Sequence, residues 1–188
     1  MISNVSKIIK HMLNISDELG WVSSLGGPLI VMDRSLMSNW SGDVGPGNHR
    51  FQESVSDYDR ACEVEGYVGT VEIDGGKALV LNDLPSQTTA FSVDSKRVLL
   101  ARWIWAENED YAKDALRRFD LEQLWNDTGL YIRFETGELV LFDSVIKGSE
   151  LVASIRLVVE SGSFGISYFA YQPDDQTRLF MIKLEQSS

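Results

Sequence analysis

The residues best suited to chemistry are four carboxylates gathered around one cysteine. They are Asp57, Asp59, Glu63 and Glu65, with Cys62 among them. In an extended segment, Asp57 and Asp59 share one face, and with Glu63 they offer the oxygen ligands that hard divalent cations prefer. A small metal-dependent hydrolase or metal-binding domain is therefore the alternative interpretation. Such clusters also arise by chance in a chain with 28 acidic residues, so we assign no metal ligands.

The thiol of Cys62 lacks the surroundings of a reactive cysteine. A reactive thiol needs nearby positive charge to stabilise its thiolate, but Arg60 is the only cation in this acidic segment. We therefore predict that Cys62 is a buried, unreactive side chain. As the only cysteine, it cannot form an internal disulfide, which favours a reducing compartment.

No candidate nucleophile has the base that it would need. Ser and Cys nucleophiles usually pair with a histidine, and the two histidines lie in a predicted helix (His11) and a glycine-rich loop (His49). The phosphate-binding loop and the dinucleotide-binding fingerprint are also absent from the sequence. We therefore predict no catalytic residue, no cofactor and no enzymatic activity.

The charge of the chain restricts its partners. The net charge of −11 opposes binding to nucleic acid or to an anionic membrane. It suits a basic protein partner, although a solvated acidic surface is the simpler interpretation. Residues 57–84 hold seven acidic and two basic residues, and residues 106–127 hold seven and three. Either segment could face a basic partner.

The N-terminal segment predicts an amphipathic helix over residues 3–19 that packs on the rest of a single domain spanning 1–188. Lysines interrupt its apolar residues, so it does not resemble a signal peptide. No window is apolar enough for a membrane span, and we expect a cytoplasmic protein.

A glycine-rich, flexible loop is predicted over 41–56. The oligomeric state stays open.

Short apolar runs separated by turn residues predict a fold of the α+β class that is dominated by β-structure. Hairpins are expected between 67–73 and 78–81 and between 131–134 and 139–142, with an interior strand at 98–105. Because short turns join the strands, the sheet should be mostly antiparallel. Further strands are expected at 29–32, 154–160, 165–171 and 177–184. Helices are expected at 35–40 and 108–125.

Tryptophan is a common interface anchor as well as a core residue. Trp103 and Trp105 share one face of the predicted strand 98–105, where core packing is the usual role. Trp40 lies beside the predicted loop. It is the tryptophan that we expect to have an exposed role.

Several motifs resemble the immunity protein 21 family. The sharpest are Gly26-Gly27-Pro28-Leu29-Ile30, Trp40-Ser41-Gly42, Asp57-Tyr58-Asp59-Arg60-Ala61-Cys62, Gly66-Tyr67-Val68-Gly69 and Ala78-Leu79-Val80-Leu81. The resemblance covers most of residues 21–184 and implies a bacterial immunity protein of a polymorphic toxin system. Such a protein would bind a toxin domain encoded by the adjacent gene and block its active site or substrate groove.

The residues that we expect to contact a toxin are aromatic or acidic and lie in or near these motifs. They are Trp40, Asp57, Tyr58, Asp59 and Tyr67. Each also has a structural interpretation, since aspartates often cap turns or pair with an arginine such as Arg60. A structural module that docks on a larger assembly through residues 1–19 is a further alternative.

Overall fold

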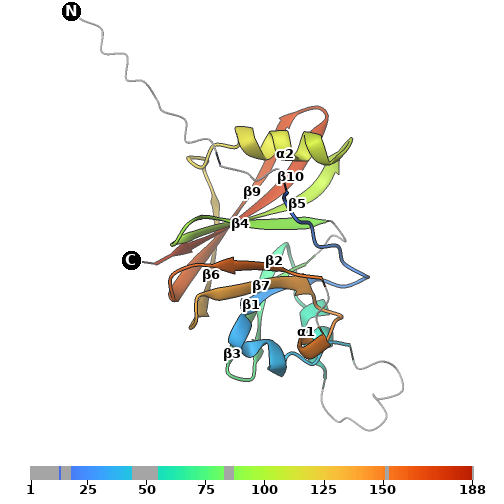
Figure 1. Ribbon diagram of the computed structural model, residues 1–188, viewed down its shortest axis with the longest axis vertical. Coiled ribbons are helices and arrows are strands. Elements are labelled where there is room, and N and C mark those ends of the chain that lie inside the picture. Colours follow the sequence, from blue (N-terminus) through green and yellow to red (C-terminus); the bar gives the residue numbers. More distant parts are fainter. Residues whose placement is uncertain (1–12, 14–17, 44–54, 83–86, 151–152, 188) are drawn as a thin grey trace, which may run out of the picture.

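The computed structural model describes residues 13, 18–43, 55–82, 87–150 and 153–187 (Figure 1). The helix predicted over 3–19 and the loop predicted over 41–56 lie mostly outside these residues. None of the described helices has the length and apolar content that a membrane crossing requires.

The first of two antiparallel sheets has the strand order β2-β3-β1-β7-β8. Every neighbouring pair in it is antiparallel, and the expected hairpin of β2 and β3 is confirmed. The strands are β1 (Leu29–Asp33), β2 (Val68–Ile73), β3 (Gly76–Leu81), β7 (Glu138–Asp143) and β8 (Ile155–Val158).

The second sheet has the order β4-β5-β10-β9-β6 and is also antiparallel throughout. The predicted interior strand is β5, which pairs with β4 on one side and β10 on the other. The strands are β4 (Thr88–Asp94), β5 (Arg97–Ala106), β6 (Asn126–Phe134), β9 (Gly162–Asp174) and β10 (Thr177–Gln186). The predicted β-dominated α+β class is confirmed.

Alternating side chains fill the space between the two sheets. In β1, Leu29 and Val31 belong to a central cluster with residues of both sheets, including Phe164 of β9. The intervening Ile30 and Met32 belong to a separate cluster on the outer face of the first sheet. The two sheets therefore share one apolar core.

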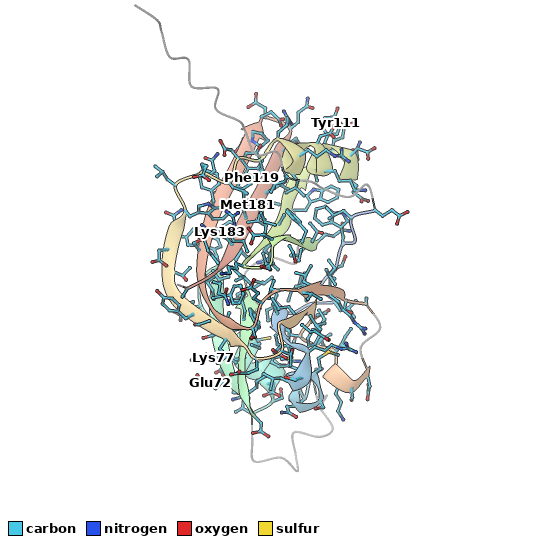
Figure 2. The ribbon with its side chains drawn as sticks, turned by 60° about the vertical axis from the view of Figure 1, so that its left-hand side comes forward. Glu72, Lys77, Tyr111, Phe119, Met181 and Lys183 are labelled. Atoms are coloured by element: carbon cyan, nitrogen blue, oxygen red, sulfur yellow. The ribbon has the colours of Figure 1, made fainter. Side chains whose placement is uncertain are left out.

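Helices cover the outer face of each sheet, and Figure 1 shows α1 and α2 at opposite ends of the molecule. Helix α2 (Glu109–Arg118) lies on the second sheet, where Phe119 at its C-cap packs in one cluster with Met181 (Figure 2). The 3-10 helix η1 (Arg34–Asn39) and helix α1 (Asp57–Cys62) cover the first sheet. Because both faces are covered, all five residues of β1 are buried. A short 3-10 helix, η2 (Gly148–Glu150), follows β7.

The hairpin predicted from 131–134 and 139–142 is wrong. Strand β6 pairs with β9, whereas β7 pairs with β1 and β8, so residues 135–137 cross from one sheet to the other. Phe134 and Leu139, on either side of this turn, both enter the central core. The sequence pattern shows that both strands have a buried face, but it cannot show that the faces belong to different sheets.

Other elements differ in extent from the predictions. Strand β4 was not predicted, because Thr88, Thr89 and Ser92 interrupt its apolar pattern. Strand β9 runs from Gly162 to Asp174 and therefore extends beyond the predicted strand 165–171 at both ends. Helix α2 ends at Arg118, although helical spacing continues to residue 125 in the sequence.

Candidate functional site

The acidic segment at 57–62 is the short helix α1, and not the extended segment in which Asp57 and Asp59 would share one face. Ser56 is the N-cap: its side chain accepts a hydrogen bond from the backbone N–H of Asp59, at 3.0 Å. The Asp59 carboxylate accepts in return from the Ser56 N–H, at 3.1 Å. This capping box satisfies two backbone donors that a helix start leaves open.

Asp57 fastens the chain near Trp40 to this helix. It is 8% exposed, and its Oδ2 accepts a hydrogen bond from the Ser41 N–H at 2.9 Å. The Ser41 hydroxyl accepts from the Asp57 N–H at 3.1 Å. Asp57 also forms an ion pair with Arg60. Asp57 therefore holds two segments together, and little of its side chain is accessible to a partner.

The carboxylates do not converge as the alternative metal site requires. On a helix, residues two apart such as Asp57 and Asp59 point in different directions, and both side chains are already hydrogen-bonded within α1. Among the described residues, no group of three or more His, Cys, Asp or Glu side chains is placed to hold a metal ion.

Trp40 is completely buried, so the expectation of an exposed indole is wrong. Its indole N–H donates to the Ser144 carbonyl oxygen at 2.8 Å, and its ring meets Phe142 edge-on at 6.4 Å. The Trp40 carbonyl accepts from the Gly148 N–H at 3.1 Å. The outer face of the first sheet and the segment after β7 enclose this residue, and only the tertiary structure brings them together.

Cys62 is exposed, so the prediction of a buried thiol is also wrong. It is the last residue of α1, whose core-facing residue is instead Ala61. A hydrogen bond with Cys62, together with burial and nearby negative charge, raises the pKa of Tyr58 to about 12. Tyr58 is half-buried and lies against Gly27.

Tyr67 is the predicted contact residue that is most accessible, with 48% of its surface exposed. It directly precedes β2 of the first sheet, yet its ring lies 4.8 Å from Phe180 and 6.0 Å from Tyr168, which belong to the second sheet. Its carbonyl accepts from the Asn82 N–H at 3.1 Å. Tyr67 therefore connects the first sheet to the second and keeps an exposed face.

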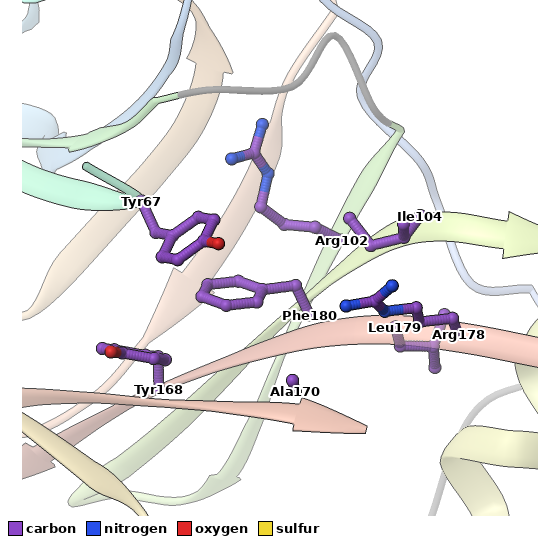
Figure 3. Close-up of a pocket in the computed structure, with 8 residues that line it drawn as sticks. All are labelled: Tyr67, Arg102, Ile104, Tyr168, Ala170, Arg178, Leu179 and Phe180. Atoms are coloured by element: carbon purple, nitrogen blue, oxygen red, sulfur yellow. The ribbon is translucent and has the colours of Figure 1, made fainter. Parts of the chain in front are cut away.

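A cavity of about 280 Å³ opens beside Tyr67 (Figure 3). Its charged wall includes Arg102 of β5, which is 2% exposed and donates a hydrogen bond to the Asn82 carbonyl. The sequence offers a signal for this site, because Arg102 is the one charged residue within the apolar run of 98–105. The cavity is lined by Tyr67, Arg102, Ile104, Tyr168, Ala170, Arg178, Leu179 and Phe180.

A second accessible surface surrounds the start of α2. Trp105 is 50% exposed, so only part of its side chain has the predicted core role. Tyr111 is 40% exposed. Glu107 and Asp110 are exposed nearby in the sequence. Both acidic segments therefore present an exposed aromatic residue beside exposed acids, Tyr67 in 57–84 and Tyr111 in 106–127, and aromatic residues are enriched at protein interfaces.

The sequence resemblance is confirmed by comparison with known families. The chain matches the family described as Immunity protein 21 over residues 20–177 of its 188 residues, a span that includes α1, α2 and strands β1 to β9. No curated protein and no solved structure matches it. Because this match covers most of its length, the chain belongs to the immunity protein 21 family.

Proposed function

We propose that this protein binds a cognate bacterial toxin domain, encoded by the adjacent gene, and blocks the toxin's active site or substrate groove. The observation that carries the proposal is the family match over residues 20–177. Neutralisation by binding requires no catalytic group of its own, so a non-enzymatic inhibitor is the simplest activity for this chain. It would act in the cytoplasm, where an internal toxin would do its damage.

The exposed residues support binding to a protein surface. Tyr67 beside the cavity and Trp105 with Tyr111 beside α2 are large, partly exposed aromatic side chains, a type enriched among the residues that dominate binding energy. We retain Tyr58, Asp59 and Tyr67 as candidate contacts. We do not propose Trp40 and Asp57 as contacts, because both are buried.

The charge supports fast association if the toxin is basic. An acidic protein attracts a basic partner over distances of about a Debye length, roughly 8–10 Å at ordinary salt, and such steering raises association rates by 10-fold or more. With a net charge of −11, this protein would be drawn to a basic toxin before any specific contact forms.

The decisive experiment mixes the purified protein with the toxin domain encoded by the neighbouring gene. We expect a stable complex in size-exclusion chromatography and restored growth of cells that express the toxin together with this protein. A toxin variant that is inactive but folded serves as the binding partner when the active toxin cannot be produced. No complex and no rescue would contradict the proposal.

A further inference from the structure

The cavity beside Tyr67 has the size of a site for a single side chain. Its volume of about 280 Å³ lies just below the range of roughly 300–1,000 Å³ that small-molecule sites occupy. A projecting side chain of a partner protein therefore fits better than a nucleotide or a cofactor. The exposed ring of Tyr67 at its edge leaves the cavity open to such a partner.

The cavity carries positive side chains in an acidic protein. Two arginines, Arg102 and Arg178, line it, and none of the described residues that line it is acidic. Arg178 of β10 is exposed and, within the described part of the chain, forms no ion pair. In a chain with 28 acidic and 17 basic residues, the guanidinium of Arg178 is therefore a positive group at the cavity that would favour a negatively charged partner group.

Aromatic side chains form an apolar wall of this cavity. Figure 3 shows the rings of Tyr67, Phe180 and Tyr168 following one another on one side of the cavity, with the Tyr67 hydroxyl turned toward Arg102. When a partner covers Arg178, the apolar walls help to exclude water, and its guanidinium then attracts a carboxylate more strongly than it does at the open surface. The Tyr67 hydroxyl can donate a further hydrogen bond to the same carboxylate.

We propose that this cavity receives an Asp or Glu side chain of the toxin, which pairs with Arg178 and packs against Tyr67. This inference rests on the proposed function, because it names the contact through which the toxin is held. It also divides the recognition of a toxin into two parts: the acidic surface would attract the partner's basic surface, and the cavity would select one acidic side chain within it.

The test compares the affinities of variants for the purified toxin domain by isothermal titration calorimetry. We expect Arg178→Glu to weaken binding about 100-fold and Tyr67→Ala about 10-fold, because residues that anchor a partner side chain cost far more than the surrounding contacts. Arg178→Gln should fall between the wild type and Arg178→Glu. Circular dichroism and thermal unfolding check that each variant is folded.

Arg156→Glu is the matched control. Arg156 is an exposed arginine of strand β8 that does not line the cavity, and its reversal changes the net charge as Arg178→Glu does. It should leave the affinity within about 3-fold of wild type. If both variants lose affinity equally, the effect is long-range charge and the cavity proposal is overturned. It is also overturned if Arg178→Glu binds like the wild type.

A charge swap identifies the toxin residue. We expect one Asp or Glu of the toxin whose change to Arg raises the affinity for the Arg178→Glu variant at least 10-fold. The same toxin change should not raise the affinity for the Arg156→Glu variant. If no toxin carboxylate does so, the proposed pairing is wrong even though the protein binds. If the wild-type protein does not bind at all, the proposed function fails, and these two failures are distinct.

Discussion

Buried carboxylates anchor the backbone at several places in this protein. Asp33, at the end of β1 and 1% exposed, accepts hydrogen bonds from the N–H and hydroxyl of Ser35, at 2.9 and 2.7 Å. It also accepts from the N–H and hydroxyl of Thr136, at 2.8 and 2.7 Å. Thr136 lies in the turn that crosses between the two sheets, so one side chain holds the end of β1 to that crossing.

Replacing Asp33 by Asn should lower the free energy of unfolding by about 2 kcal/mol at pH 7, since hydrogen bonds to a charged group are worth roughly 1.5–3 kcal/mol. Burial acts to raise the pKa of Asp33, but hydrogen bonds from Thr136 and Ser35 outweigh it and the pKa is lowered. Such a group stabilises the fold above its unfolded pKa of about 3.9 and loses this contribution as the pH falls through the folded value.

Urea denaturation at several pH values measures this effect. The difference between the wild type and Asp33→Asn should therefore shrink below about pH 4. Asp175→Asn is the control, because Asp175 is an exposed aspartate in the turn between β9 and β10; it should unfold like the wild type. A difference that stays constant down to low pH would contradict the role of the Asp33 carboxylate.

The exposure of Cys62 can be checked directly. Because the thiol is exposed at the end of α1, we expect the folded protein to react fully with a thiol reagent, at a rate within about 10-fold of the urea-unfolded chain. Burial in a core would instead slow the reaction by the equilibrium cost of opening the fold. A reaction more than about 1,000-fold slower would restore the buried interpretation.

The helices act as covers for sheet faces that would otherwise be exposed. Phe119, 1% exposed at the C-cap of α2, meets Tyr171 edge-on at 4.8 Å and Trp125 at 5.8 Å. The Tyr171 hydroxyl donates to the Ala115 carbonyl at 3.3 Å. Through these contacts a helix of ten residues, short for independent stability, is held on the second sheet.

Truncating Phe119 to Ala should lower the free energy of unfolding by about 3–5 kcal/mol, the usual cost of removing a buried aromatic ring. Tyr111→Ala on the same helix is the control: Tyr111 is 40% exposed, and its removal should cost less than about 1 kcal/mol. Guanidinium denaturation compares the two variants. Equal losses would show that α2 contributes as a whole and that Phe119 is not its anchor.

At the scale of the molecule, the two sheets depend on one another. Their inner faces form one cluster that draws residues from β1, β3 and β7 of the first sheet and from β4, β5, β6, β9 and β10 of the second. Tyr67 adds a contact from the first sheet to the second at the cavity. Neither sheet could keep its inner face buried without the other.

Because the two sheets share one core, we expect the whole protein to unfold in one cooperative transition, as small single domains usually do. Tryptophan fluorescence and far-UV circular dichroism should give the same midpoint in urea. The predicted single domain would be wrong if the two probes reported separate transitions. Deleting residues 1–19 tests the predicted helix: if it packs on the domain, the midpoint falls.

The strands were more predictable than their partners. The positions of β1, β2, β3 and β5 followed from apolar runs between turn residues, because backbone geometry and burial act locally there. The strand that pairs with β6 could not be predicted from the sequence. Phe134 and Leu139 show the same apolar signal whether they face one another in a hairpin or meet from opposite sheets. Strand β4 was missed because threonine and serine weaken its pattern.

The candidate contact residues were only partly predictable. A tryptophan beside a loop can be an exposed interface residue or a buried core residue. The sequence around Trp40 does not distinguish these two roles. Its burial depends on Phe142 and Ser144, about a hundred positions away in the chain. The cavity could be suspected from Arg102 within an apolar strand, but the residues that complete it come from three other segments.

The sequence by itself determined the β-dominated class, most strand positions and the family, because these depend on local periodicity and on motifs that stay contiguous in the chain. Only the tertiary structure decided that Trp40 and Asp57 are buried, that Cys62 is exposed and that Tyr67 borders a cavity. Exposure and cavities depend on which distant segments pack together. That packing is set by the free energy of the whole folded chain and not by any local stretch of sequence.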